Sequence, residues 1–398
     1  MSKLTRRQLL ASIASGFGVS VGATFLPSWV TDSLVHSATP SLSYLLKKKD
    51  KNGLMLLRGF RSRIVAESGE RPSPNSNYEW HPLPDGGAVF RTPKKGWIYV
   101  SNSEVGDRGG GVGALVFDRN AKVIDAYSIC KRTSRNCAGG PTPWNTWLTC
   151  EETSEGFVWE CDPFGRKAPR RHTAMGRFYH EAAVVDSRTF IAYMTEDHGN
   201  GGFYRFIPKR KSKTKADYSK GTLQVARLVN GNKLDWVRVP EPLAHPKIGS
   251  KALMERGRNK KVDYTTFNRG EGACYHKGPG KVLFATTGDN TIWTYDTSTR
   301  YLHKVYEGGG SLTEPDNLTV LNRGLILVAE DAGNLEIVGI SQKTGKVFPI
   351  MRMIGHGGSE VTGPAFDPSG RRLYFSSQRG KDGRGITFEV RGPFYKYV

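Results

Sequence analysis

Trp97-Ile-Tyr-Val-Ser-Asn-Ser-Glu104 is a short apolar run that ends in small polar residues and an acid. Similar runs recur at residues 147–152, 190–197, 282–289, 325–331 and 373–378, and all but the last of them end in an acid. The ends of these runs fall forty to fifty residues apart, except for one doubled gap between Asp197 and Asp289. Basic segments within 209–261 occupy that gap, which indicates one repeat that carries a long basic insertion.

A second series of polar residues precedes these runs by about ten to fifteen residues, and a turn rich in Gly, Pro, Asp or Asn separates the two series. Its members are Asn136-Cys137, His180-Glu181, Arg269-Gly270-Glu271, Glu314-Pro315-Asp316-Asn317 and Glu360-Val361. Two apolar runs joined by such a turn are typical of a β-hairpin. The start of the first strand and the end of the second lie side by side in a hairpin, so both series should emerge at one edge.

Repeats of this length, each with several short strands, are typical of a β-propeller, in which the innermost strand of every blade lines a central channel. We therefore predict an all-β, six-bladed propeller with four-stranded blades and one long basic insertion, forming a single domain over 38–398. The first blade should contain residues 78–104, and a terminal strand at 386–390 should close the last. A β-sandwich is the alternative, but it does not explain why the acids recur at the same position of each repeat.

The first 37 residues are expected to be a signal peptide of the twin-arginine type. Arg6-Arg7 precedes a mildly apolar stretch at 11–25 that is too short to anchor stably in a bilayer. Beyond it no run has the length of a membrane-spanning helix. We therefore expect recognition by the twin-arginine export machinery, a periplasmic or secreted location, no stable membrane anchor, and a monomer.

The chain is strongly basic, with a formal net charge of +21. Its basic runs are spread along the sequence in turn-like contexts, whereas nucleic-acid binding favours a concentrated patch with interleaved aromatics. The charge thus suits a small anionic substrate and argues against nucleic acid as a partner. Of the five cysteines, Cys130, Cys150, Cys161 and Cys274 are interpreted as core or disulfide residues, and His180 and His276 as packed or surface histidines.

The acids of both series are predicted to meet at one mouth of the channel. Carboxylates buried together repel one another unless protons or cations compensate them. Since their sequence neighbours are mostly Gly, Thr, Ala and Asn, bound metal is favoured over ion pairs, although each single acid could instead cap a turn. Oxygen ligands suit calcium, and the Cys137 thiolate admits iron. Arg269 lies two residues before Glu271 and could bind a phosphate or pair with an acid.

The segment Asn136-Cys-Ala-Gly-Gly-Pro-Thr-Pro-Trp-Asn-Thr-Trp-Leu-Thr-Cys-Glu-Glu152 closely resembles the hallmark segment of the PhoX-type alkaline phosphatases, with support from 176–181, 193–197, 269–273 and 314–318. The resemblance implies hydrolysis of phosphomonoesters at a cluster of Ca²⁺ and Fe³⁺ ions. It makes Arg269 and Glu271 the catalytic residues and Arg269 and Asn317 the phosphate-binding ones. The metal ligands would be Cys137, Glu151, Glu152, Glu181, Glu196, Asp197, Glu271, Asp316, Glu330 and Glu360, and Asp331 belongs to the same predicted mouth.

Two departures from the family pattern bear on this expectation. The chain is shorter than the well-known family members, and Cys274 stands where an aromatic residue is expected. Two other functions remain open from the sequence. A calcium-dependent lactonase or esterase on a propeller would not need Cys137 or Arg269, and a non-catalytic periplasmic binding propeller would leave the channel acids unfilled.

Overall fold

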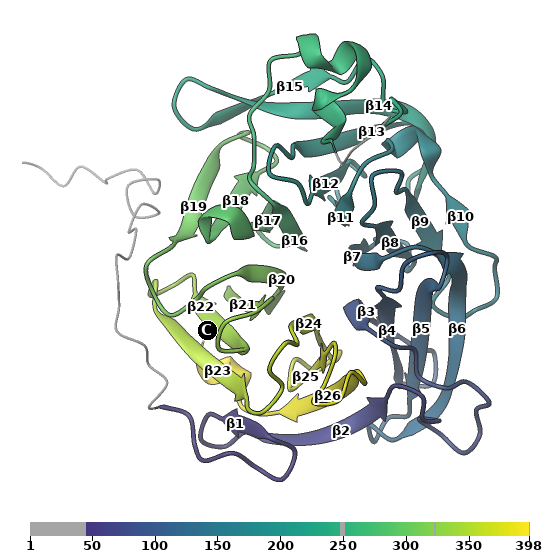
Figure 1. Cartoon of the computed structure of the whole chain (residues 1–398), viewed down its shortest axis with the longest axis vertical. Helices are drawn as coiled ribbons and strands as arrows, with labels where there is room; N and C mark the ends of the chain where they lie inside the picture. Colours follow the sequence, from purple (N-terminus) through teal and green to yellow (C-terminus); the bar gives the residue numbers. More distant parts are fainter. Residues whose placement is uncertain (1–44, 247–250, 322–323, 398) are drawn as a thin grey trace, which may run out of the picture. The chain divides into compact units, whose positions relative to one another are not determined.

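The computed structural model describes residues 45–246, 251–321 and 324–397. The predicted signal peptide at 1–37 lies outside these residues. The described strands form six antiparallel sheets, arranged as a ring around a central space (Figure 1). This confirms the all-β, six-bladed propeller that the repeats predict.

The blades follow one another along the chain. Blade 1 contains β3 (Pro84–Arg91), β4 (Trp97–Ser103), β5 (Gly110–Phe117) and β6 (Val123–Thr133). Blade 2 contains β7 (Asn136–Pro141), β8 (Trp147–Glu151), β9 (Val158–Cys161) and β10 (Arg170–Arg171). Blade 3 contains β11 (His180–Val185), β12 (Ala192–Glu196), β13 (Phe203–Lys211), β14 (Ala216–Val229) and β15 (Lys233–Arg238).

The second half of the ring continues the same pattern. Blade 4 contains β16 (Gly270–His276), β17 (Lys281–Thr286), β18 (Thr291–Asp296) and β19 (Leu302–Glu307). Blade 5 contains β20 (Pro315–Leu321), β21 (Leu325–Glu330), β22 (Glu336–Ser341) and β23 (Val347–Met353), with β1 (Leu54–Leu56) at its edge. Blade 6 contains β24 (Val361–Phe366), β25 (Arg372–Ser377), β26 (Ile386–Arg391) and β2 (Arg61–Glu67).

The predicted hairpins form the two inner strands of every blade, and the first strand of each hairpin lies nearest the channel (Figure 1). The second strands are buried on both faces, because neighbouring blades pack against them. Aromatic contacts join the blades: the ring centroids of Phe203 and Phe284 are 4.4 Å apart, and those of Phe117 and Tyr374 are 4.8 Å apart. These contacts form the core between adjacent sheets.

The ring is closed by a strand from the N-terminal side of the propeller. β26, the strand expected at 386–390, is the third strand of blade 6, and β2 pairs with it as the outermost one. Blade 6 therefore combines three strands from the C-terminal end of the chain with one from the beginning. Because β2 precedes blade 1 in the chain and pairs with β26 of blade 6, it ties the first blade to the last.

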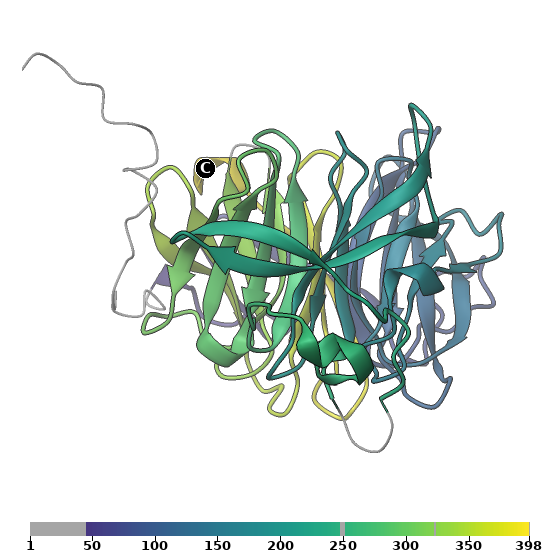
Figure 2. The ribbon, with the colours of Figure 1, turned by 90° about the horizontal axis from the view of Figure 1, so that it is seen from above.

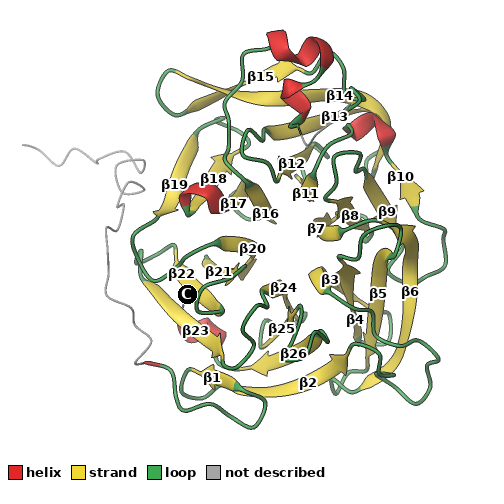
Figure 3. Cartoon of the chain, viewed as in Figure 1, coloured by secondary structure: helices red, strands yellow, loops and turns green. Residues whose placement is uncertain are grey.

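The basic insertion belongs to blade 3. β13 and β14 form a long hairpin at the outside of the ring, followed by β15 and two short 3₁₀ turns at Leu253–Glu255 and Gly257–Lys261 (Figures 1 and 2). All the helical segments of the described chain are short turns in loops (Figure 3). None of them has the length and apolar character needed to cross a bilayer.

Candidate metal centre

The first strand of every blade begins with a β-bulge. In blade 1, Pro84 pairs with Ser103 and Gly87 pairs with Ser101, so that Asp85 and Gly86 have no partners in the ladder. A bulge bends the strand and redirects a side chain. The residues at the six equivalent positions are Asp85, Cys137, Glu181, Glu271, Asp316 and Gly363. Five of the six blades thus place an acid or a thiol at the same point of the ring.

Hydrogen bonds between adjacent blades fix the backbone of these bulges. In four blades, an Asn or Thr donates to a backbone carbonyl of the next blade around the ring, either within the bulge or at the residue just before it. The bonds run from Asn102 Nδ2 to the oxygens of Cys137 (2.7 Å) and Ala138 (2.8 Å), from Thr195 Oγ1 to Glu271 (2.6 Å), from Thr287 Oγ1 to Pro315 (2.7 Å), and from Thr362 Oγ1 to Pro84 (2.7 Å). The bulges are therefore held in place independently of any bound ligand.

The bulge side chains converge with acids from the ends of the second strands. Three groups have ligand atoms that all lie within 4.8 Å of one another. They are Cys137 with Glu152 and Glu181, Glu181 with Glu271 and Asp316, and Asp85 with Glu104 and Glu360. The three groups draw on all six blades or the loops beside them. The acids therefore meet at one mouth, as the hairpin argument predicted.

Glu181 belongs to two of these groups and is the least satisfied acid of the mouth. Its side chain is 0% exposed, and neither carboxylate oxygen has a hydrogen-bond partner among the described residues. Burial raises the pKa of Glu181 well above its usual value, and the carboxylates of Glu271 and Asp316 add to the rise. A carboxylate in this position needs a proton or a cation to balance it.

The pKa values of the acids and the thiol around Glu181 are raised as well. Burial, then the charge of Asp197, raises the pKa of Glu271 well above normal. Burial, with Asp331 nearby, raises the pKa of Asp316 to about 8. The pKa of the Cys137 thiol is raised as well, first by burial and then by the surrounding carboxylates. A mouth that disfavours this much negative charge has the electrostatics of a multivalent cation site.

Two arginines reach the mouth and already contact its acids. Arg269 donates from Nε and Nη2 to the carboxylate of Asp197 at 2.9 and 3.2 Å, and its Nη2 lies 3.0 Å from Glu271 Oε1. Arg379 is paired with Glu360. Both guanidinium groups remain partly exposed, with 41% and 42% of their side chains accessible. They are accessible to an anion that enters from solvent.

Asp197, a predicted ligand, lies outside the three groups and is paired with Arg269. Three other predicted ligands, Glu151, Glu196 and Glu330, also lie outside them. Each accepts a hydrogen bond from the N–H six residues later, in the same blade: Phe157 for Glu151 (3.2 Å), Gly202 for Glu196 (3.1 Å) and Glu336 for Glu330 (2.9 Å). Further donors reach them from Trp159, Tyr204 and Thr313. These carboxylates hold the turn between the second and third strands. The acid that follows each one, Glu152, Asp197 or Asp331, points to the opposite side.

Asn317 is also engaged within the ring. Its Nδ2 donates to Asp316 Oδ1 at 2.8 Å, and its Oδ1 accepts from the Gly363 N–H at 2.8 Å. The side chain is buried, with only 4% exposed. Asn317 thus links blade 5 to blade 6 and orients Asp316, and both polar atoms of its amide have partners.

Sequence reasoning missed three members of the mouth: Asp85, Glu104 and Arg379. Asp85 lies in Pro84-Asp85-Gly86-Gly87, which occupies the same position in its hairpin as Asn136-Cys137-Ala-Gly does in the next one. An alignment of the hairpins could therefore have found Asp85. Glu104 ends the first quoted run. Gln378 Nε2 donates to Asp85 Oδ2 (2.6 Å) and Glu104 Oε2 (2.9 Å), so this third group is already partly balanced.

The remaining cysteines and His180 lie outside the three groups. Cys130, Cys150, Cys161 and Cys274 are free thiols in the structure. His180 packs on Phe178, with ring centroids 3.5 Å apart, and burial lowers its pKa to about 3. His180 is therefore a packed neutral imidazole, in agreement with its interpretation from the sequence.

The chain is similar in fold to solved structures. Pseudomonas fluorescens PhoX in complex with vanadate, a transition state analogue, is similar with a TM-score of 0.70 and 17% identity, over 90% of this chain and 98% of that chain. A Bacteroides thetaiotaomicron protein of unknown function has a TM-score of 0.50 and 8% identity, over 83% and 76%. A Xanthomonas campestris gluconolactonase has a TM-score of 0.48 and 13% identity, over 85% and 91%. No curated protein matches the chain.

The sequence itself carries the family assignment. A family model described as "Alkaline phosphatase PhoX" matches residues 86–300, more than half of the chain. The matched residues begin beside Asp85 and include Cys137, Glu152, Glu181 and Glu271, four of the acids and thiols that meet at the mouth. This assignment favours the phosphatase over a lactonase or a non-catalytic binding protein. With its six bulged blades and acidic mouth, the chain belongs to the PhoX family of alkaline phosphatases, which are metal-dependent phosphoric monoester hydrolases.

Proposed function

We propose that the mouth of the channel holds Ca²⁺ and Fe³⁺ ions and hydrolyses small phosphomonoesters there. The observation that carries the proposal is Glu181, a fully buried acid without a hydrogen-bond partner at the junction of two ligand groups. Burying an unpaired carboxylate is costly, and bound cations would remove that cost. The ligands would be Asp85, Glu104, Cys137, Glu152, Glu181, Glu271, Asp316 and Glu360.

The donor atoms differ between the groups, and this supports two kinds of ion. The group of Glu181, Glu271 and Asp316 offers only carboxylate oxygens, as does that of Asp85, Glu104 and Glu360. Oxygen donors suit calcium. The group with Cys137 adds a sulfur donor, which suits iron. Because burial raises the pKa of Cys137, its thiolate form would depend on a cation nearby.

Arg269 is the proposed phosphate-binding residue. Its guanidinium is partly exposed, and Asp197 and Glu271 hold it at the edge of the mouth. The planar group can donate two parallel hydrogen bonds to phosphoryl oxygens. In this proposal Asp197 is a positioning residue, and Glu271 both orients Arg269 and binds metal. Arg379, held by Glu360, approaches the mouth from blade 6 and would bind the same anion.

In this mechanism the residues of the chain bind and orient, and they do not themselves attack the ester. When bound, the metal ions supply positive charge against the phosphoryl oxygens and activate an oxygen nucleophile. Arg269 adds charge that stabilises the phosphoryl group as the ester bond breaks. The bulges, fixed by Asn102 and the threonines of neighbouring blades, keep the ligand atoms in place through the reaction.

The export route belongs to the same proposal. Arg6-Arg7 in the segment 1–37 supports export through the twin-arginine pathway, and 38–398 would then be the mature single-domain enzyme in the periplasm or outside the cell. That pathway carries folded proteins, which suits a propeller whose cluster is assembled before export. The N-terminal residue of the protein recovered from the periplasm tests this directly. A mature chain that begins at Met1 would contradict it.

The proposed activity is tested by elemental analysis together with one assay. The purified protein should contain calcium and iron and should release phosphate from a chromogenic phosphomonoester. Cys137→Ala should lose iron and activity, and Arg269→Ala should lose activity but keep the metals. A matched control is Cys150→Ala, since Cys150 is a buried free thiol outside the three groups. A protein that hydrolyses phosphomonoesters after complete metal removal would refute the proposed role of the metals.

A further inference from the structure

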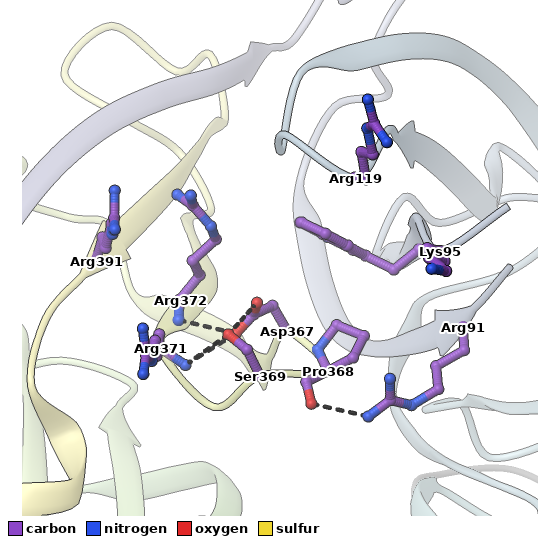
Figure 4. A pocket seen from close by; sticks show the side chains of 10 residues that line it. Arg91, Lys95, Arg119, Asp367, Pro368, Ser369, Arg371, Arg372 and Arg391 are labelled. Carbon is purple, nitrogen blue, oxygen red and sulfur yellow. Dashed lines mark hydrogen bonds between the residues drawn. The ribbon is translucent and has the colours of Figure 1, made fainter.

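A second charged site lies at the other end of the blades. The turns around Lys95, Arg119 and Ser369 lie at the edge of the sheets opposite the bulges. In each inner hairpin the first strand starts at the mouth, and the turn that follows it lies at the far edge. Between these turns is a hollow of about 530 Å³, lined by residues of blade 1 and blade 6 (Figure 4). Its lining residues are separate from those of the acidic mouth.

The hollow is strongly basic. Among the described residues that line it, six side chains are cationic and one is a carboxylate: Arg91, Lys95, Arg119, Arg371, Arg372, Arg391 and Asp367. The carboxylate is already used locally, since Asp367 accepts from Ser369 Oγ (2.6 Å) and from the N–H groups of Arg371 and Arg372 (2.9 Å each). Asp367 therefore shapes the turn and forms no ion pair with the described arginines around it.

The strand register places like charges side by side. Arg391 on β26 pairs directly with Arg61 on β2 and with Arg372 on β25, so that three arginines form one row across adjacent strands. Like charges directly opposite each other destabilise a sheet. Glu389 lies in the next row and forms ion pairs with Arg63 of its own row and with Arg372 of the arginine row. Arg61 and Arg391 thus remain a repulsive pair at the edge of the hollow.

The hollow has one buried aromatic residue in its lining and cations on two sides. Trp97 is buried, and its Nε1 donates to Tyr374 Oη at 3.1 Å, across the junction of the blades. Arg91 donates to the Pro368 carbonyl at 2.9 Å, which ties the turn of blade 6 to blade 1. Figure 4 shows Arg119 and Lys95 on one side and Arg371, Arg372 and Arg391 on the other. A ligand between them would contact both blades.

We propose that this hollow binds a compact anion that carries at least two phosphate groups, at a site distinct from the acidic mouth. Arginine forks bind phosphate oxygens in pairs, and five of the six cations here are arginines. The cations face each other across the hollow, and its volume of about 530 Å³ has room for more than one phosphate group. A concave site of this size favours a compact soluble anion over the flat surface of a membrane.

Such a ligand would also act on the closure of the ring. The hollow joins blade 1 to blade 6, the blade that β2 completes. An anion that bridges the two blades would relieve the repulsion of the arginine row and would bind only the folded chain. It should therefore raise the melting temperature, because a ligand that binds only the folded state stabilises it.

The test uses the metal-loaded protein and methylenediphosphonate, a non-hydrolysable anion with two phosphonate groups. The double variant R371S/R391S removes two cations that have no ion-pair partner within the described structure. R210S/K213S removes the same charge from the exposed tip of the β13–β14 hairpin and is the matched control. Calorimetric affinity and the ligand-induced rise in melting temperature are measured for all three proteins. Any binding of the probe to the metals of the mouth is common to them.

We expect R371S/R391S to bind methylenediphosphonate about tenfold more weakly than the wild type and to lose most of the thermal shift. Without the probe it should melt at the same temperature as the wild type or higher, because the arginine row is relieved. Its activity on a chromogenic phosphomonoester should be unchanged. Equal affinity in the wild type, R371S/R391S and R210S/K213S would overturn the proposal. If R371S/R391S binds methylenediphosphonate as the wild type does and loses only its co-sedimentation with phosphatidylglycerol vesicles, the hollow binds a membrane and the proposal is overturned.

Discussion

Replacing Glu181 with Gln should have opposite effects on the stability of the metal-free and the metal-loaded protein. The ligand atoms of Glu181, Glu271 and Asp316 lie within 4.8 Å of one another. Two unit charges at 4.8 Å repel by about 3.5 kcal/mol at an effective dielectric constant of 20. E181Q removes this repulsion from the metal-free protein while it keeps the size of the side chain.

E181Q should gain less stability than the full repulsion energy, because in the wild type an acid with a raised pKa binds a proton and so reduces the repulsion. At pH 9 we therefore expect metal-free E181Q to be about 1 to 2 kcal/mol more stable than metal-free wild type. In the metal-loaded protein the same change removes a charged ligand and should destabilise by about 3 kcal/mol. The melting temperature should rise in the first case and fall in the second.

The assay is thermal unfolding at a fixed scan rate, with EDTA-treated and metal-reconstituted samples side by side. E151Q is the matched control, since Glu151 accepts from Ser134 N–H and Trp159 Nε1, both at 3.0 Å, and lies outside the metal groups. E151Q should destabilise the metal-free and the metal-loaded protein alike, by about 1 to 3 kcal/mol. If metal-free E181Q melts below metal-free wild type, the acids of the mouth do not repel each other and the reasoning fails.

Three further outcomes are expected. R269K should lower kcat/KM for a chromogenic phosphomonoester about 100-fold with little change in melting temperature, because Lys cannot reproduce the paired bonds of Arg269. Burial opposes ionisation of Glu160, but hydrogen bonds from His172 and Trp144 outweigh it and lower the pKa of Glu160 to about 2. Its contribution of up to about 3 kcal/mol is present above pH 4.5 and lost as pH falls toward 2, so E160Q should flatten the acid-unfolding curve over that range. G363A should reduce the yield of folded protein, because its Cβ would lie 2.6 Å from Asp85 O at a φ of +63°.

The blades could be predicted from the sequence because each inner hairpin repeats the same apolar run, turn and polar ends. The strand that closes the ring could not be predicted in this way. β2 (Arg61–Glu67) ends in an acid as the repeated runs do, but its partner β26 is more than three hundred residues away. Only the three-dimensional closure of the sheet brings these two segments together.

The sequence predicted the candidate site as a set of acids, but it did not separate an acid that faces the mouth from its neighbour in the chain. Runs such as Glu151-Glu152 end in two consecutive polar residues, and alternation along a strand lets only one of them face the channel. Which one does so depends on the register of the hairpin, and the bulge after Asn136 sets that register. Sequence composition does not contain the position of a bulge. Glu152 therefore reaches Cys137, whereas Glu151 holds the next turn.

Gly363 explains how a ring with repeated blades produces an asymmetric site. The bulge position in the other five blades carries an acid or a thiol, but here a side chain would meet the Asp85 carbonyl and the Tyr99 hydroxyl. Blade 6 instead supplies Glu360 from the loop before β24, together with Arg379. The carboxylates of blades 3 to 5 thus converge on Glu181, while the side of blades 6 and 1 already has Arg379 and Gln378 as partners. The greatest need for a balancing cation therefore falls at Glu181, on the side of the mouth where Arg269 also lies.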